Sequence, residues 1–458
     1  MVQSFAIVTP LRDKLSPRIT SMFNLLSNKH KIGLLGDANC GKTVFLTSLL
    51  WNLEAAQLYL GKKHDIPTDI KIHPLTSLPT SCCFGYEENV RSFKDHKKWP
   101  AKTTSEYALA RCSYKLPKHL PYEITFVDIP GDRMADMLIW QYTSYADWSA
   151  ATLKSWERSS QLSQYLRAYN DSIQHPSTTF DRLTWYFKCG MRSMFESFIP
   201  QVSPSTLFFA DGKEVEQKQL SNDDFIRKRP IWKDGDIQRD FIPLPSEWKT
   251  ASPSSKQTYA ECEQNYKLYR KKVVTPLFSQ ISSCDSFIYC IDILGILAAC
   301  PEAFHKTQEE IQGFMNKVMP GLFRWLLTTI GMNPMRIAFV ATKSDKVYGI
   351  NLNHLKNLLK DIVKPYRKAQ IQDEYFTCTA WNSTWEKNGY AACRVMINDT
   401  ITPAIIQVPE LPDTFSNDWN GEKYQYLETE ILPSPVNAKP PQQTGIDSIL
   451  NYVIDGIL

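Results

Sequence analysis

The sequence has no pair of cysteines in C-x-x-C spacing and no H-E-x-x-H run, so the common zinc-binding patterns are missing from it. Its eleven cysteines are scattered, and an odd number without regular spacing is typical of reduced thiols in a cytoplasmic protein. We therefore expect no disulfide scaffold. A chain of 458 residues is long enough to be stabilised by a hydrophobic core instead.

Long apolar runs are also missing. The longest, Phe287–Cys300, has 14 residues and includes Asp292, whereas a membrane-spanning helix needs about 20 apolar residues. Near the start, the apolar run Phe5–Val8 is too short for the core of a secretory signal, and acidic Asp13 follows soon after it. We therefore expect a cytoplasmic protein that is not an integral membrane protein, although it can still lie on the inner membrane as a peripheral protein.

A strong charge of one sign is absent as well. The formal net charge is +4, which is small for this length, whereas nucleic-acid-binding domains are usually much more basic. We therefore expect no nucleic-acid partner. Length alone favours about two to three domains.

What the sequence does contain is an alternation of short apolar runs with amphipathic stretches. Short apolar runs are typical of buried strands, and apolar residues spaced by three and four positions are typical of helices. Their alternation predicts an α/β fold with a mostly parallel sheet between helices. The predicted strands are 31–35, 107–114, 122–127, 287–291, 335–341 and 375–378, and the main predicted helices are 10–30, 42–58, 351–364 and 446–457. The rest of 60–120, and the proline-rich stretches 200–253 and 400–444, are predicted to be irregular.

The first predicted strand runs into a sequence that matches the phosphate-loop pattern G-x-x-x-x-G-K-[ST]. A glycine turn lets successive backbone N–H groups point into one cavity, and the following helix adds its positive dipole end. Lys42 would reach the β- and γ-phosphates, and the Thr43 hydroxyl would bind Mg²⁺. The alternative is a glycine turn with an exposed lysine. The predicted nucleotide-binding residues here are Gly36, Asp37, Ala38, Asn39, Cys40, Gly41, Lys42, Thr43 and Val44.

The predicted strand 122–127 ends in Asp128-Ile-Pro-Gly131, the D-x-x-G pattern of GTPases. A carboxylate at this end of a strand lies where α/β sheets bind ligands, and Asp128 is predicted to hold a magnesium-bound water. The N–H of Gly131 would approach the γ-phosphate. On its own the pattern also fits an ordinary Asp followed by a Pro-Gly turn.

Thr342-Lys343-Ser344-Asp345 follows the predicted strand 335–341 and matches [NT]-K-x-D. The Asp345 carboxylate would accept both the N1–H and the 2-amino group of guanine, while the Lys343 stem would pack on the base. Adenine would leave that carboxylate unpaired, so the pattern favours guanine. A solvated loop is the alternative, in which case the protein is an ATPase. Thr379, Ala380 and Trp381, after the next strand, are predicted to lie near the guanine O6, with an ordinary strand exit as the alternative.

The catalytic residues are less clearly marked. Thr103, or its neighbour Thr104, is predicted to bind Mg²⁺ from a mobile switch loop when the γ-phosphate is present. No glutamine follows Gly131, so Asp132 is the candidate to orient water, and Arg133 and Lys42 are the candidates to neutralise charge. We expect slow hydrolysis of GTP unless a partner supplies a group. Asn39 makes K⁺ a further candidate cofactor, against the alternative of a plain polar loop residue.

About 155 residues separate Gly131 from the predicted strand at 287, far more than a minimal G domain needs. We therefore predict a P-loop NTPase fold of the G-domain type with an inserted, mainly helical subdomain. The insert would either couple the nucleotide state to a protein effector or membrane surface, or act as a stabilising cap. The predicted domains are 1–132 and 286–400 for the two parts of the G domain, 133–285 for the insert, and 401–458 for an irregular segment with a closing helix.

Together these patterns resemble the YcjX-like family of bacterial P-loop proteins. The resemblance is carried by Gly36–Thr43, Trp99-Pro100 with Thr103, Tyr122–Gly131, Thr342–Asp345, Asp285–Pro301 and the closing helix. It implies a cytoplasmic G domain with a helical insert, and a stress-response setting linked to phage-shock genes and a neighbouring membrane protein. Asp132 stands where some relatives carry Glu.

Three functions remain open at this point: a GTP/GDP switch with slow GTPase activity, an ATPase of the same fold, and a scaffold that holds nucleotide without hydrolysing it.

Overall fold

A computed structural model describes residues 29–454, except for 62–63, 76–78, 80–81, 97, 101–106, 118, 120, 158–162, 176–177, 197–201, 211–212, 215–218, 220–221, 319–334, 369–370, 389, 398–399, 407–408, 417–418, 429 and 435–438. The predicted magnesium ligand Thr103 and most of the predicted helix 10–30 therefore lie outside the described residues. The chain divides into two compact units, which are described one at a time. The first contains Met1–Gly131, Ser279–Ala299 and Val318–Leu458, and the second contains Asp132–Phe278 and Cys300–Lys317.

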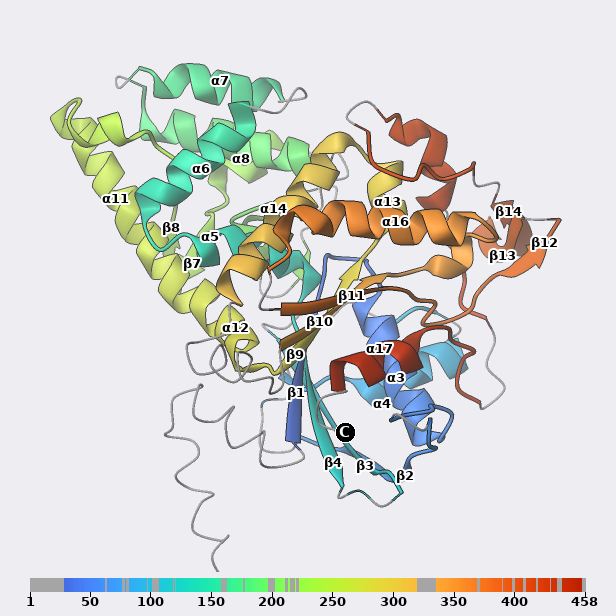
Figure 1. The fold of residues 1–458 in the computed structure, drawn as a ribbon. Helices are drawn as coiled ribbons and strands as arrows, with labels where there is room; N and C mark the ends of the chain where they lie inside the picture. Colours follow the sequence, from blue (N-terminus) through green and yellow to red (C-terminus); the bar gives the residue numbers. More distant parts are fainter. Residues whose placement is uncertain are drawn as a thin grey trace, which may run out of the picture. The chain divides into compact units, whose positions relative to one another are not determined.

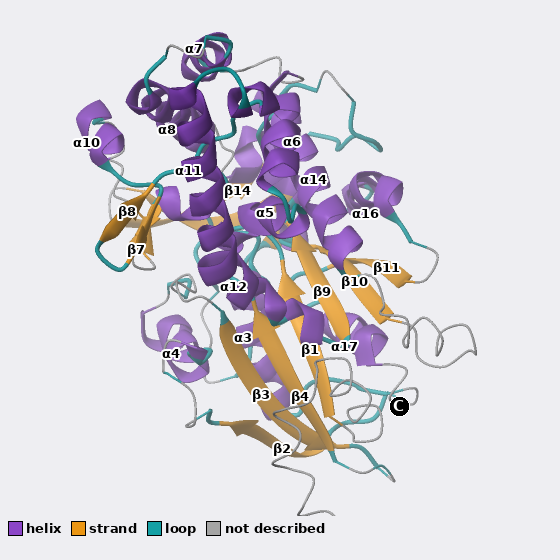
Figure 2. Ribbon diagram, turned by 90° about the vertical axis from the view of Figure 1, so that its left-hand side faces the viewer, coloured by secondary structure: helices purple, strands orange, loops and turns teal. Residues whose placement is uncertain are grey.

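The first unit is built on a seven-stranded sheet with the order β11-β10-β9-β1-β4-β3-β2 (Figure 2). Strands β4, β1, β9, β10 and β11 run parallel to one another, and β2 and β3 add an antiparallel edge. The expected mixed α/β architecture with a mostly parallel sheet is thus confirmed. The strands are β1 (Lys29–Leu35), β2 (Thr68–His73), β3 (Ala108–Lys115), β4 (Tyr122–Asp128), β9 (Ser286–Ile291), β10 (Met335–Ala341) and β11 (Ile371–Thr377).

Helices cover both faces of this sheet (Figure 1). Apolar side chains of α3 (Lys42–Glu54) and α17 (Ile446–Ile454) share one buried cluster with side chains of the central strands, so these two helices lie on the same face. Helix α16 (Asn351–Val363) packs against β10 and β11 and lies on the opposite side (Figure 1). The prediction of a helix to residue 58 was too long, because α3 ends at Glu54 and the chain then turns into a short bridge between Leu60 and Asp65.

A second, three-stranded antiparallel sheet follows β11 in sequence, and only its last strand lies in the stretch 400–444 that was predicted to be irregular. It consists of β12 (Trp385–Lys387), β13 (Tyr390–Ile397) and β14 (Thr400–Ile406). One face buries Ala391, Cys393 and Val395. The other face exposes large apolar side chains, each between 43% and 52% accessible: Trp385, Tyr390, Met396, Ile401 and Ile405. The prediction of an irregular 400–444 is therefore wrong for β14, whose Pro403 is tolerated because the strand lies at the sheet edge.

The second unit is mainly helical. Its longer helices are α6 (Tyr145–Glu157), α7 (Gln164–Ile173), α8 (Phe180–Glu196), α11 (Pro253–Tyr269) and α14 (Pro301–Lys317). Helix α14 follows β9 and α13 (Ile293–Ala298) in sequence but packs against α5 (Met137–Gln141) in this unit. The shorter elements are α10 (Asp223–Lys228), α12 (Thr275–Ser279) and the hairpins β5–β6 (Phe209–Ala210, Lys213–Glu214) and β7–β8 (Trp232–Asp234, Ile237–Arg239).

Buried hydroxyl groups hold the irregular stretch 240–245 of the second unit in place. The Tyr145 hydroxyl donates to the Ile242 carbonyl, and the Tyr169 hydroxyl donates to the Pro243 carbonyl, both at 2.6 Å. Buried main-chain carbonyls without a helix or sheet partner are costly, and these side chains satisfy them. An aromatic core surrounds the stretch, in which Trp148 stacks on Tyr266 and both contact Phe241.

The described residues also form several shorter elements. In the first unit they are α4 (Tyr86–Arg91), η2 (Ser92–His96), η7 (Ile281–Ser283), α13 (Ile293–Ala298), η8 (Ser344–Lys346), η9 (Lys364–Tyr366) and η10 (Gly421–Glu428). Those that begin in or belong to the second unit are η3 (Gly131–Asp136), η4 (Ser205–Leu207), η5 (Ser246–Lys249) and η6 (Arg270–Val274). Among the described residues, no helix combines the length and the hydropathy that crossing a membrane would need.

Candidate functional site

The candidate site begins where β1 ends. Strand β1 lies at the centre of the sheet, with β4 on one side and β9 on the other, so the chain places later strands on both of its sides. In open α/β sheets, ligands bind beyond the carboxyl ends of the strands at such a point. The loop from Gly36 to Gly41 and the start of α3 occupy this position.

The loop has a backbone that demands small or flexible residues. Gly36, Asn39 and Gly41 have φ angles of 132°, 63° and 93°. A Cβ atom on Gly36 would lie 2.0 Å from the Cys290 carbonyl oxygen, so only glycine fits there. The loop therefore turns tightly against β9 before α3 begins. The first main-chain N–H groups of a helix point out of its N-terminal end, so those of α3 point toward the loop.

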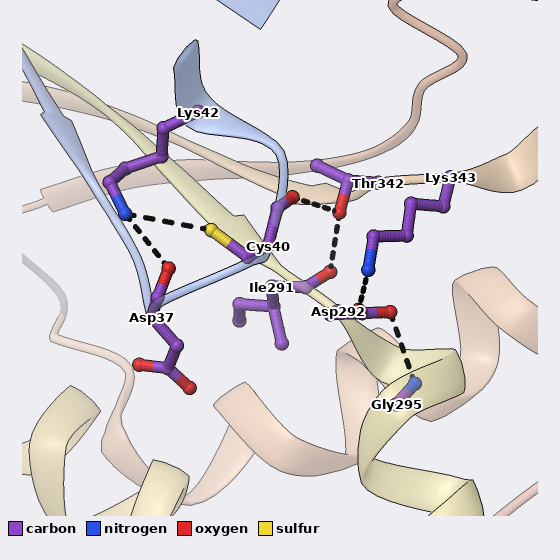
Figure 3. Close-up of polar contacts among 8 residues, drawn as sticks. All are labelled: Asp37, Cys40, Lys42, Ile291, Asp292, Gly295, Thr342 and Lys343. Atoms are coloured by element: carbon purple, nitrogen blue, oxygen red, sulfur yellow. Dashed lines mark hydrogen bonds and ion pairs between the residues drawn. The ribbon is translucent and has the colours of Figure 1, made fainter. Parts of the chain in front are cut away.

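Lys42 lies inside this loop and is buried. Its ammonium donates to the main-chain carbonyl of Gly36. It also donates to the main-chain carbonyl of Asp37, at 2.8 Å (Figure 3). Burial opposes its charge, but the negative groups around it, including Asp128 and Asp37, raise its pKa above the ordinary value for lysine. The loop thus encloses a permanent positive charge that is met by neutral carbonyls and is suited to an anion.

Cys40 lies at the bottom of the same loop and is fully buried. Burial raises the pKa of its thiol to about 11, although the nearby Lys42 acts in the opposite direction. The thiol is therefore neutral at physiological pH.

The Asp128–Gly131 segment packs directly on the loop. Asp128 ends β4, is fully buried, and pairs in register with Leu34 of β1. A Cβ atom on Gly131 would lie 2.3 Å from the Ala38 nitrogen and 2.5 Å from the Asp37 carbonyl oxygen. Only glycine permits this approach, so the structure brings the D-x-x-G segment and the glycine loop into direct contact.

The Thr342–Asp345 segment reaches the loop from the other side of β9. The Thr342 hydroxyl donates to the Cys40 carbonyl at 2.6 Å (Figure 3). Next along the chain, the Ser344 N–H donates to the Cys378 carbonyl at 3.2 Å, and the Ser344 and Thr379 hydroxyls lie 2.8 Å apart. These hydrogen bonds join the exits of β10 and β11 to the glycine loop.

Asp345 is partly buried at the far end of this segment. Its Oδ2 accepts a hydrogen bond from the Ser383 N–H at 3.2 Å. Burial raises the pKa of its carboxyl above the usual value, and the Ser383 N–H offsets only part of that effect. The carboxylate therefore sits in a place where further donors would stabilise it.

One residue of the site was missed by sequence reasoning. Asp292, the first residue after β9, forms an ion pair with Lys343 through Oδ2 and accepts from the Gly295 N–H at 3.0 Å through Oδ1 (Figure 3). In the sequence it appears only as a single acidic residue inside the apolar run Phe287–Cys300, where it counts against a membrane-spanning helix. The contact with Lys343 arises because β9 and β10 are neighbouring parallel strands.

The side chains of Trp381 and Val44 pack in an aromatic cluster. The Trp381 ring is buried and stacks on Phe93 with 3.7 Å between ring centroids, next to Trp51 and Trp99. Val44 packs against the same aromatic cluster. Both side chains therefore belong to one aromatic cluster, while the main chain at Thr379 pairs with Thr444.

The candidate catalytic residues after Gly131 belong to the second unit. Asp132 and Arg133 are partly buried in η3, and the Arg133 guanidinium donates to the Ser205 hydroxyl at 2.9 Å. Asn39 is exposed at the tip of the loop. Within the part of the chain that the structure describes, three or more His, Cys, Asp and Glu side chains nowhere gather in a group suited to a metal ion.

These features define a mixed α/β protein whose candidate site lies at the carboxyl edge of a mainly parallel sheet. The chain belongs to the YcjX-like family, DUF463, whose family model matches residues 30–193 and 234–458. The matched residues include every segment of the site described above, and they leave out 194–233 in the helical unit. A search among curated proteins found no match.

Proposed function

We propose that the first unit is a P-loop NTPase of the G-domain type that binds GDP and GTP with Mg²⁺. The observation that carries the proposal is the hydrogen bond from the Thr342 hydroxyl to the Cys40 carbonyl. It joins the segment with the guanine-reading pattern to the loop with the phosphate-binding pattern, so the two ends of one nucleotide have adjacent places to bind.

The phosphates would bind in the Gly36–Thr43 loop. Lys42 already holds its charge there, on the carbonyls of Gly36 and Asp37. Charge-assisted bonds to a phosphate oxygen are stronger than bonds to a neutral carbonyl, so the ammonium would turn toward a bound phosphate. The start of α3, a helix of 13 residues, adds main-chain donors and a positive dipole end.

The oxygen atoms available beside the loop suit magnesium. Mg²⁺ prefers hard oxygen ligands and keeps several waters, so it is usually held by one or two protein groups together with phosphate oxygens. The Thr43 hydroxyl and the Asp128 carboxylate would supply these groups. The metal would neutralise charge on the phosphates, and the buried position of Asp128 keeps its carboxylate next to the loop.

Asp345 would select the base. Burial disfavours its carboxylate, and main-chain N–H groups, including that of Ser383, offset only part of this effect. Guanine offers two adjacent donors that would stabilise the charge, whereas adenine offers none in that position. Leaving a buried group unpaired costs about 1–3 kcal/mol, and more for a charged group, so the preference for guanine is expected to be about tenfold or more.

Slow hydrolysis is part of the proposal. No glutamine follows Gly131, and Arg133 is engaged with Ser205. Lys42 would neutralise the developing charge, and Asp132 is the proposed group to orient water. Phosphoryl transfer by related folds gains about 10³–10⁵-fold from an arginine that reaches the phosphate, so hydrolysis without a partner is expected to be slow.

The test is a titration of the purified full chain with fluorescent GDP and Mg²⁺, followed by competition with unlabelled GDP, ADP and XDP. It compares the wild type with Asp345→Asn. The matched control is Asp361→Asn, because Asp361 also accepts a main-chain N–H, from Phe415 at 2.9 Å, and lies on α16, outside the segments of the candidate site.

The expected result is a preference for GDP over ADP of about tenfold or more in the wild type and in Asp361→Asn. In Asp345→Asn the preference is expected to move toward XDP, whose 2-oxo group pairs with the amide. Equal competition by ADP and GDP, with no change in Asp345→Asn, would show that the protein is an ATP-binding protein instead.

A further inference from the structure

The ion pair between Asp292 and Lys343 lies beside the proposed base site. The sequence patterns that predict the base site do not include Asp292. Asp292 follows β9 and Lys343 lies two residues after β10, at the carboxyl ends of neighbouring strands. One carboxylate oxygen of Asp292 contacts the Lys343 ammonium, and the other accepts from the Gly295 N–H (Figure 3). Both oxygens of this carboxylate are therefore committed, which fixes its orientation.

The backbone of Lys343 is held in an unusual conformation. Its φ angle is 57°, in the left-handed region that a lysine rarely adopts. The residues on both sides fix it, because the Thr342 N–H donates to Ile291 and the Ser344 N–H donates to Cys378. The main chain therefore points the Lys343 side chain in one direction, and Asp292 meets its end.

The pair is charged at physiological pH. Burial alone would raise the pKa of the Asp292 carboxyl, but the Lys343 ammonium, with Lys346 and the Gly295 N–H, holds the pKa below the ordinary value for aspartate. The two side chains are 17% and 30% exposed, so solvent screens their attraction only in part.

We infer that Asp292 is a positioning residue that holds the Lys343 stem as one wall of the guanine site and thereby sets how long the nucleotide stays bound. The inference rests on the proposed guanine binding. A free lysine side chain samples many rotamers, and ordering it on binding weakens affinity. Because Asp292 orders it beforehand, the nucleotide meets a preformed wall. Such effects act mainly on the dissociation rate.

The experiment measures dissociation of fluorescent GDP after an excess of unlabelled GDP is added to the full chain with Mg²⁺. Asp292→Asn removes the charge but keeps the cap of α13, because asparagine is also a favoured N-cap and its amide oxygen accepts the Gly295 N–H. Lys343→Met removes the ammonium and keeps an apolar stem. The double variant completes the cycle.

We expect Asp292→Asn to speed GDP dissociation by about tenfold, equivalent to about 1.4 kcal/mol, with little change in the association rate. In the Lys343→Met background, Asp292→Asn is expected to add less than about twofold, because the partner is already absent. GDP should still be preferred over XDP, and the nucleotide-free chain should unfold at a slightly lower temperature, because the folded state loses the ion pair. A purely structural role for Asp292 would produce neither the rate difference nor its loss in the double variant.

The matched control is Asp373→Asn. Asp373 forms an ion pair with Arg367 at 2.9 Å near the start of β11, the end of the sheet opposite the site. Asp373→Asn is expected to release GDP at the wild-type rate. Equal rates in wild type and Asp292→Asn, or a full tenfold effect in the Lys343→Met background, would overturn the inference and leave guanine binding intact. Failure of the wild type to bind GDP would overturn the proposed function and, with it, this inference.

Discussion

The Thr342 hydroxyl donates a hydrogen bond to the Cys40 carbonyl at 2.6 Å, across 302 residues of sequence. Both residues are buried, so water does not compete for this bond. It couples the exit of β10 to the turn of the glycine loop, and any shift of one segment must be shared by the other. A change at Thr342 is therefore expected to act on both ends of a bound nucleotide.

Thr342→Val removes this hydroxyl while it keeps the shape of the side chain. A buried hydrogen bond contributes about 1 kcal/mol, so the free energy of unfolding is expected to fall by about 1 kcal/mol. The Kd for GDP is expected to rise about fivefold, which corresponds to the same energy. Isothermal titration and urea unfolding measure the two quantities. Thr342→Ser keeps the hydroxyl and serves as the control. Equal Kd values for all three proteins would show that the bond does not organise the site.

Gly131→Ala is expected to disturb the contact between the D-x-x-G segment and the loop. The added methyl would lie 2.3 Å from the Ala38 nitrogen, and a forced shift of this kind costs about 1–3 kcal/mol. Urea unfolding and GDP titration should both show the loss. Gly85→Ala is the control, because its nearest neighbour would be a Glu88 oxygen at 3.9 Å and its φ of −74° suits alanine. An unchanged Gly131→Ala would contradict the close approach.

The central strands were predictable because burial on both faces leaves a continuous apolar run. Met335–Ala341 matches the predicted strand residue for residue, and Ser286–Ile291 begins one residue earlier than predicted. Strand β14 was missed because Pro403 interrupts its alternation and because one of its faces is exposed rather than buried. A strand of that kind resembles a proline-rich loop until its partner β13 is known.

The parts of the site that came from contiguous patterns were predicted, and those that depend on tertiary contacts were not. Gly36–Thr43 and Thr342–Asp345 are each local in sequence, and the structure places them in contact. Asp292 owes its position to the pairing of β9 with β10, which no local pattern shows. In the same way, nothing near Trp381 in the sequence indicates that Phe93 stacks on it.

Asp345 predicts a pH dependence of stability. Burial raises its pKa in the folded chain above the value near 3.9 of an unfolded aspartate. As pH rises between these two pKa values the unfolded state loses its proton first, so this group favours folding below the window and disfavours it above. Asp345→Asn is therefore expected to melt at a higher temperature than the wild type at neutral pH without nucleotide, and the gap should close as pH falls through the window.

With GDP and Mg²⁺ present the order is expected to reverse, because ligand binding stabilises only the protein that binds it well. Thermal melts from about pH 4 to pH 8, with and without GDP, measure both effects. If Asp345→Asn melts at a lower temperature than the wild type at neutral pH without nucleotide, the buried Asp345 charge does not carry the cost assigned to it.

Asp136→Asn is expected to destabilise the helical unit. Its fully buried carboxylate accepts from the Ser203 hydroxyl, the Ser205 N–H and hydroxyl, and the Tyr269 hydroxyl. These bonds hold 203–205 and α11 onto η3, the segment that begins with Gly131.

Asp136→Asn replaces one acceptor oxygen with a donor amide. Because bonds to charged groups contribute about 1.5–3 kcal/mol, the free energy of unfolding is expected to fall by about 2 kcal/mol. Asp171→Asn, at an exposed position on α7, is the control and should change it by less than about 0.5 kcal/mol. If urea unfolding gives the same value for both variants, this carboxylate does not anchor the start of the helical unit.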